Sequence, residues 1–144
     1  MAQIILVGTD GSEGADRAIE FALQHAKNYE MSLEVVHVIE WTPYSFELPE
    51  ELEIRHKMRE SEIKSADEQI IAPILAKYGD QGVEIIGTVR HGDVSEVLCE
   101  LAQAHEVAHI VLGKKGRSRI QELLHGNVVG RMVQVAPVPI SIVP

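Results

Sequence analysis

The sequence predicts an α/β fold in which five parallel strands form one doubly wound sheet with helices on both faces. Short, continuous apolar runs are typical of buried parallel strands. The stretches between these runs carry apolar residues every three or four positions, as amphipathic helices do, and the two patterns alternate along the chain. With 144 residues and 45% hydrophobic content, the chain has the size of one ordinary domain, so we expect a single domain over residues 1–144.

Five apolar runs are predicted to be strands. They are Gln3–Val7, Leu33–Ile39, Val83–Val89, Ala108–Leu112 and Val138–Val143. The residues GTDGS follow the first run and predict a tight turn at the end of that strand. The last run follows Pro137 and is expected to lie at an edge of the sheet, because it is the last strand wound onto it.

Four helices are predicted between these strands. Ser12, Asp93 and Asn127 are candidate N-caps for the first, third and fourth helices. The apolar stripe of the first helix consists of Ala15, Ala18, Ile19, Ala22, Leu23 and Ala26. The second helix is a long charged segment, Glu50–Tyr78, with a kink expected at Pro73.

The charge and composition of the chain exclude several classes of protein. A formal net charge of −9 argues against a general nucleic-acid binder or a protein that binds anionic membranes. No apolar stretch approaches the roughly 20 residues of a membrane-spanning helix, so direct insertion into a membrane is not expected. The sequence has no secretory signal pattern and one cysteine, Cys99, which we expect to be a small buried hydrophobe; these features predict a cytoplasmic protein.

A glycine-rich segment, GKKGRSRIQELLHGN at residues 113–127, lies between the fourth strand and the last helix. Its glycines Gly113, Gly116 and Gly126 have the spacing G-x2-G-x9-G. Four of the chain's 13 Lys and Arg residues lie at its start, namely Lys114, Lys115, Arg117 and Arg119. Free backbone amides at the start of a helix, together with nearby cations, favour phosphate binding. The alternative is a flexible, solvated connector.

Asp10 follows the first strand and is expected at the same edge of the sheet as the glycine-rich segment, because ligands of such folds bind beyond the carboxyl ends of the strands. A carboxylate beside a phosphate site would repel the anion, so hydroxyl recognition, as at a ribose, is its expected role. The equally supported alternative is a structural one, in which Asp10 closes a turn or caps the following helix.

The residues VGTDGS, HVI and LGKKGRSRIQELLHGNV before VPISIV resemble the universal stress protein family, in its ATP-binding subgroup. The resemblance covers the whole chain. It implies a Rossmann-like fold, ATP or another adenine nucleotide as cofactor, and a nucleotide-responsive regulatory or sensor function in stress response. It also implies a homodimer through the last strand, Val138–Val143, and a regulatory protein as a further partner.

The resemblance also implies which residues bind the nucleotide. Asp10 matches the acidic residue at the ribose and adenine, and Val38 matches the second-strand position near adenine. The full set implied is Gly8, Thr9, Asp10, Val38, Gly113, Gly116, Arg117, Ser118, Gly126, Asn127, Val128 and Val129. The family has Ser or Thr where this chain has Asn127, which removes a hydroxyl that could hold phosphate or metal. Magnesium, if it enters with the nucleotide, would be held chiefly by phosphates and waters.

Two other functions stay open at this point. A slow ATPase is the enzymatic alternative, although the chain has no Walker G-x4-G-K-[S/T] sequence, and we assign no catalytic residue. The second alternative is a nucleotide-free dimeric regulator, for example of a transporter, that acts through its dimer surface and the stretch Trp41–Pro49. A phosphoacceptor domain is excluded, because Arg90 stands where it would need an Asp.

The seven histidines do not predict a metal site. His105 and His109 are four residues apart, but they cross the predicted boundary between a helix and a strand, and no zinc-like pattern accompanies them. His91 follows the third predicted strand and is interpreted as a turn residue at the edge of the ligand pocket.

Overall fold

The structure, a computed structural model, describes residues 3–40, 49–114 and 128–144 and contains the predicted five-stranded parallel sheet. The strands are β1 (Ile4–Gly8), β2 (Ser32–Glu40), β3 (Ile85–Gly92), β4 (His109–Gly113) and β5 (Ile140–Val143). Their order across the sheet is β3-β2-β1-β4-β5, and every neighbouring pair is parallel. The predicted fold class is therefore confirmed.

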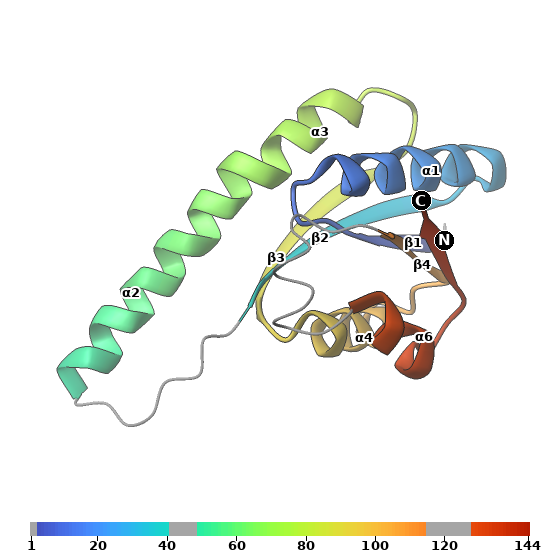
Figure 1. Ribbon diagram of the computed structural model, residues 1–144. Coiled ribbons are helices and arrows are strands. Elements are labelled where there is room, and N and C mark those ends of the chain that lie inside the picture. The colour runs from blue at the N-terminus through green and yellow to red at the C-terminus, as the bar shows by residue number, and fades with distance from the viewer. Residues whose placement is uncertain (1–2, 41–48, 115–127) are drawn as a thin grey trace.

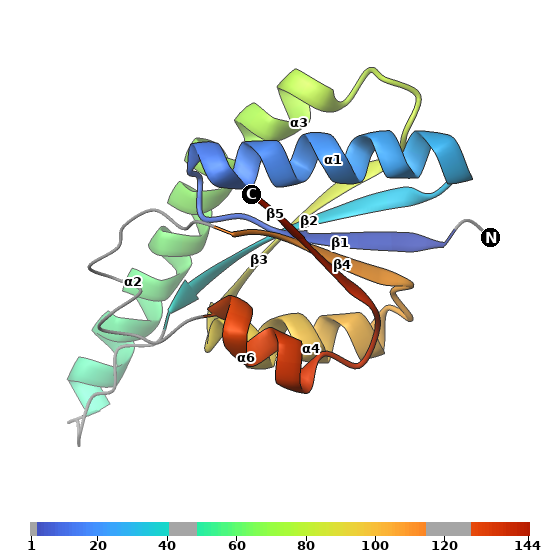
Figure 2. The same cartoon turned by 45° about the vertical axis from the view of Figure 1, so that its right-hand side comes forward.

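Helices cover both faces of this sheet (Figure 1). The helices are α1 (Glu13–Tyr29), α2 (Pro49–Ala66), α3 (Ala72–Tyr78), α4 (Val94–Ala104) and α6 (Val128–Val135). Helices α1 and α3 lie on one face, and α4 and α6 lie on the other, as Figure 2 shows from a second side. Helix α2 extends beyond the sheet, and its side chains from residue 53 to 65 are largely exposed.

Each face of the sheet has its own apolar core, because the side chains of a strand alternate between the two faces. Ile5, Val7 and Val111 pack against the apolar stripe of α1, which is buried as predicted. Leu6 and Ile110 pack on the other face with α4 and with Met132 of α6. The two cores explain why the interiors of β1 and β4 are apolar on both faces instead of alternating with polar residues.

Two of the predicted helix caps are present. The Ser12 hydroxyl accepts a hydrogen bond from the backbone N–H of Ala15, and the Asp93 carboxylate accepts one from Glu96. Both capping residues have extended backbone, as N-caps usually do. The third predicted cap, Asn127, lies outside the described residues.

The long charged segment is helical, and Pro73 does not break it. Between α2 and α3 the chain forms a π-helical segment, Asp67–Ile71, in which the N–H of Ala72 bonds to the carbonyl of Asp67. Pro73 follows directly, in the first turn of α3. A local widening of the helix therefore lies directly before the proline, at the position where the kink is expected.

The third strand lies closer to the C-terminus than predicted. Its predicted start, Val83, follows Gly82, whose φ of +82° belongs to a turn, so the strand begins only at Ile85. At its other end, pairing with β2 continues through Glu40 and Gly92. The interpretation of His91 as a turn residue is therefore wrong, because it lies within β3.

Strand β5 is at an edge of the sheet, as predicted from its place at the end of the winding order. Its four residues are half-buried. Over the part of the chain that the structure describes, no helix is both long and apolar enough to cross a membrane.

Candidate functional site

The winding direction of the sheet reverses at β1. From β1 the chain moves outward through β2 to β3, and then returns to place β4 on the other side of β1. In open parallel sheets, ligands bind beyond the carboxyl ends of the two strands at such a reversal. Here those ends are Gly8 of β1 and Gly113 of β4, so the structure brings together the first predicted turn and the start of the glycine-rich segment.

The turn after β1, residues Thr9–Ser12, is held by its own polar groups. The Thr9 hydroxyl accepts a hydrogen bond from the N–H of Gly11 at 3.1 Å, and the Asp10 carboxylate accepts one from the N–H of Ser12 at 2.9 Å. Gly11 has a φ of +82°, which strains any residue with a side chain. The structural role considered for Asp10, closing a turn, is therefore present. It is compatible with ligand binding, because a carboxylate can accept several hydrogen bonds at once.

Strand β2 holds the Thr9–Ser12 turn from the side. The N–H of Thr9 donates to the carbonyl of Val36 at 2.8 Å, and Nδ1 of His37 lies 2.8 Å from the carbonyl oxygen of Thr9. Thr9 itself is buried, with 7% of its surface exposed. The sequence alone predicts no role for His37. The signal that could have found it is a polar residue inside the apolar run LEVVHVI.

Two predicted site glycines are explained by packing. A side chain on Gly113 would place its Cβ 2.8 Å from the carbonyl oxygen of Gly14, in the first turn of α1. A Cβ on Gly8 would lie 2.9 Å from a methyl carbon of Leu112. Because the backbone of Gly14 cannot move aside as a flexible side chain can, Gly113 is needed where β4 ends against α1.

The other described residues of the predicted site lie at or near the same edge. Val38 is in the carboxyl half of β2 and belongs to the core beneath α4 and α6, with 9% of its surface exposed. Lys114, one of the cations of the glycine-rich segment, follows β4 and is exposed, and its N–H donates to the carbonyl of Val143. Val128 and Val129 form the half-buried start of α6.

Five predicted site residues lie outside the described residues, as does most of the stretch through which the nucleotide-free regulator would act. The site residues are Gly116, Arg117, Ser118, Gly126 and Asn127. In the stretch Trp41–Pro49, only Pro49 is included, as the first residue of α2. Phosphate binding by the glycine-rich segment therefore stays a prediction.

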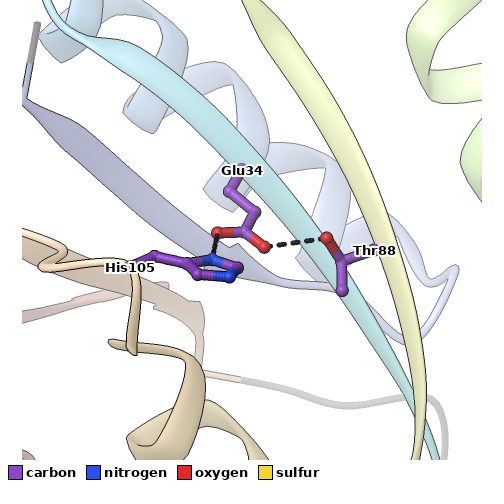
Figure 3. A network of polar contacts seen from close by, with 3 residues as sticks. All are labelled: Glu34, Thr88 and His105. Atoms are coloured by element: carbon purple, nitrogen blue, oxygen red, sulfur yellow. Dashed lines mark hydrogen bonds and ion pairs between the residues drawn. The ribbon is translucent and has the colours of Figure 1, made fainter. Parts of the chain in front are cut away.

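A second polar group lies away from this edge, in the amino half of β2. Glu34 is fully buried, and its two carboxylate oxygens bind different partners, His105 and Thr88. Figure 3 shows the two partners approaching Glu34 from opposite sides. Nδ1 of His105 lies 2.7 Å from Oε1, and the Thr88 hydroxyl donates to Oε2 at 2.7 Å. We call these three residues the Glu34 network, which the sequence alone does not predict.

Among the described residues, His91 and Cys99 also contact other parts of the chain. No group of three or more His, Cys, Asp or Glu side chains among the described residues could hold a metal ion. Nε2 of His91 lies 2.9 Å from a carboxylate oxygen of Glu62, which ties α2 to the carboxyl end of β3. Cys99 is only half-buried, because it lies at the border of the α4 and α6 core, where burial raises the pKa of its thiol. A thiol with a raised pKa is a poor nucleophile.

Comparison with known proteins gives this fold a family. The family model described as "Universal stress protein family" matches residues 1–144. The chain belongs to the universal stress protein family. The universal stress protein Rv1996 of Mycobacterium tuberculosis is 26% identical over 152 residues, which is 97% of this chain and 47% of that protein. The chain thus spans about half the length of the first curated relatives it matches.

Solved universal stress protein structures share the fold. UspA from Lactobacillus plantarum superposes with a TM-score of 0.78 at 20% identity, over 99% of this chain and 97% of that one. A family member from Arabidopsis thaliana with AMP bound has a TM-score of 0.67 at 19% identity, over 98% and 90%. A universal stress protein in complex with cAMP has a TM-score of 0.61 at 24% identity, over 99% and 96%. At these identities the likeness concerns the fold.

Proposed function

We propose that this universal stress protein is a nucleotide-responsive regulatory or sensor protein that binds ATP, or another adenine nucleotide, between the carboxyl ends of β1 and β4. One observation carries the proposal. The winding reversal puts the Thr9–Ser12 turn beside the end of β4, where the glycine-rich segment begins. The contact between Gly113 and the first turn of α1 keeps these two strand ends close together.

The proposal divides the site into a hydroxyl-binding part and a phosphate-binding part. Asp10 would accept hydrogen bonds from the ribose hydroxyls, with Gly8, Thr9 and Val38 lining the adenosine side. The phosphates would bind the backbone amides and side chains of the glycine-rich segment and of the following helix start. Those residues are Gly113, Gly116, Arg117, Ser118, Gly126, Asn127, Val128 and Val129.

Charge supports this division. The first turn of α1 carries Glu13 and Asp16, so a phosphate is disfavoured there. Lys114 follows β4 directly, and α6 begins at Val128 with no acidic residue in its first turn, so the β4 side suits an anion better. The related structures with AMP and cAMP favour an adenine nucleotide as the ligand. Magnesium would enter with ATP, held by phosphates and waters.

We further propose that residues 1–144 form one domain and that this domain forms a homodimer through Val138–Val143. The edge position of β5 supports the dimer, because an edge strand can pair with a second chain. A regulatory protein would read the nucleotide state of this dimer. The single cysteine, Cys99, agrees with a cytoplasmic setting, where disulfides are rare.

Calorimetric titration with ATP, ADP, AMP and cAMP tests the proposal. Asp10→Asn is the sharpest variant, because its amide oxygen can still accept the hydrogen bond from Ser12 while the charge is lost. Loss of a charge-assisted hydrogen bond is expected to weaken binding by about ten- to a hundredfold. The matched control is Asp80→Asn, an exposed carboxylate in the turn after α3, which should bind as the wild type does.

The outcomes separate the proposal from its alternatives. If no adenine nucleotide binds and none raises the melting temperature, the proposal fails and the nucleotide-free regulator is favoured. If radiolabelled ATP is turned over and Asp10→Ala abolishes the turnover, the protein is an ATPase and not only a binding protein.

A further inference from the structure

We infer that His37 is a positioning residue for the proposed nucleotide site: its imidazole fixes the peptide between Thr9 and Asp10 and so sets where the Asp10 carboxylate lies. The inference rests on the proposed function, since it assigns His37 to the hydroxyl-binding part of that site. His37 is a half-buried residue in the carboxyl half of β2, next to the Thr9–Ser12 turn.

The geometry determines the form of the imidazole. Nδ1 of His37 is 2.8 Å from the carbonyl oxygen of Thr9, a short hydrogen-bond distance. A carbonyl oxygen only accepts, so Nδ1 carries the hydrogen and the neutral ring is the Nδ1–H tautomer. The ring therefore acts as a fixed donor toward the turn.

Two consecutive residues of β2 thus hold both backbone groups of Thr9. Val36 accepts from the N–H of Thr9 at 2.8 Å through its backbone, and His37 donates to the carbonyl through its side chain. The paired register of β1 with β2 ends at Gly8 and Val36. Beyond that point the chain turns away from β2, and the longer reach of an imidazole extends the attachment by one more peptide.

The Thr9–Asp10 peptide is the start of a short series of hydrogen bonds. The Thr9 hydroxyl binds the N–H of Gly11, and Asp10 binds the N–H of Ser12. The Ser12 hydroxyl then caps α1 at Ala15. Rotation of the first peptide would change the backbone angle of Asp10 and move its carboxylate. Because His37 restrains that peptide from a neighbouring strand, its removal is expected to loosen the ligand-binding turn more than the fold.

Two variants of His37 test this role. His37→Asn keeps a donor, because Nδ2 of Asn is separated from Cα by the same number of bonds as Nδ1 of His. His37→Leu removes the donor and keeps an apolar side chain suited to β2. The matched control is His109→Asn. His109 is a half-buried histidine at the start of β4, at the opposite end of the strand from the carboxyl edge. Its Nε2 lies 2.7 Å from the hydroxyl of Ser141 in β5.

The measurements are the Kd for ATP and the free energy of unfolding of each variant. His37→Leu should weaken ATP binding by about tenfold, the effect of losing one hydrogen bond that orders the site, and His37→Asn should restore most of it. The control should change the Kd by less than about twofold even if it unfolds more easily. Wild-type affinity in His37→Leu, or equal weakening by Asn and Leu, overturns the inference.

A second readout needs no nucleotide, so failure of the inference can be told from failure of the proposed function. In two-dimensional ¹H–¹⁵N NMR spectra of the ligand-free protein, the amide signals of Gly11 and Ser12 report on the turn. His37→Leu should displace both signals, and His37→Asn should return them close to their wild-type positions. If the wild type binds no nucleotide but the signals respond in this way, the proposed function fails and the positioning role stands. If both signals stay in place in His37→Leu, the positioning role fails.

Discussion

Strand β2 contains two polar residues that bond to other elements, Glu34 in its amino half and His37 in its carboxyl half. In the amino half, the Glu34 carboxylate is fully buried and binds Thr88 of β3 and His105 at the end of α4. In the carboxyl half, the His37 imidazole binds the backbone of the Thr9–Ser12 turn. Both groups contain a histidine and both cross between elements, but only the second contacts the turn at the carboxyl edge of the sheet, where the nucleotide site is proposed.

The difference between the two groups follows from where β1 ends. Beside Glu34, β1 and β3 flank β2 on both sides, at Leu6 and Ile86, so the carboxylate must be satisfied inside the protein. Beside His37, β1 has ended, and the imidazole binds a turn that is open to the carboxyl edge. Polar residues inside a buried strand thus stabilise the fold, while those at a strand's carboxyl end can shape a site.

The largest effect on stability is expected for Glu34→Ala. The variant leaves the Thr88 hydroxyl and the His105 imidazole without their carboxylate, which should lower the free energy of unfolding by about 2–4 kcal/mol. ATP binding by the folded fraction should not change, because the Glu34 network is remote from the carboxyl edge. Urea denaturation and calorimetry measure the two quantities.

Two further variants sharpen this test. Glu34→Gln keeps an oxygen that accepts from Thr88 and should recover much of the stability. Glu84→Ala removes an exposed carboxylate near the start of β3 and should change the free energy of unfolding by less than about 0.5 kcal/mol. If Glu34→Ala weakens ATP binding as strongly as Asp10→Asn does, the division between the two regions is wrong.

A smaller loss of stability is expected for Gly113→Ala, at the other side of the candidate site. The added Cβ would lie 2.8 Å from the backbone oxygen of Gly14, and relief requires β4 and α1 to separate slightly. Overpacking of this kind typically lowers the free energy of unfolding by about 1–3 kcal/mol. Gly82→Ala, at a glycine with a φ of +82° and open space around it, is the comparison for backbone strain without a clash. Equal ATP affinity in wild type and Gly113→Ala would mean that this glycine serves packing alone.

The smallest effect concerns a third histidine, His109, which contacts the neutral Ser141 hydroxyl and the ring of His25. Burial, and secondarily the charge of His25, lowers its pKa from the usual 6.5. The unfolded chain therefore binds a proton at this position more readily than the folded one. This contribution destabilises the fold as the pH falls below about 6.5 and vanishes above it.

His109→Gln tests that contribution through the pH dependence of stability. Between about pH 7 and about pH 5, the variant should lose stability less steeply than the wild type. Asn28→Gln, at an exposed residue of α1 that does not titrate, should keep the wild-type slope. An unchanged slope in His109→Gln would show that His109 is equally easy to protonate in both states.

The sequence predicted elements where one local rule decides the outcome. The apolar runs of β1 and β4 had no other stable place than a covered sheet, and the Ser12 and Asp93 caps follow from side chains that can reach their own helix start. It misjudged β3 by three residues at its carboxyl end, because that boundary depends on pairing with β2. It missed His37 and Glu34 as functional or structural groups, because their partners are distant in the chain, 28 and 71 residues away for Thr9 and His105.

The amino-acid sequence by itself determined the alternation of strands and helices, the turn after β1, and the family to which the chain belongs. Periodicity, capping and turn chemistry act over a few residues, so they can be read from neighbours in the chain. Only the tertiary structure decided that His37 lies beside the turn after β1 and that the Glu34 carboxylate is fully buried. These positions depend on the order of the strands across the sheet. The same order places β1 and β4 side by side although about a hundred residues separate them in the chain.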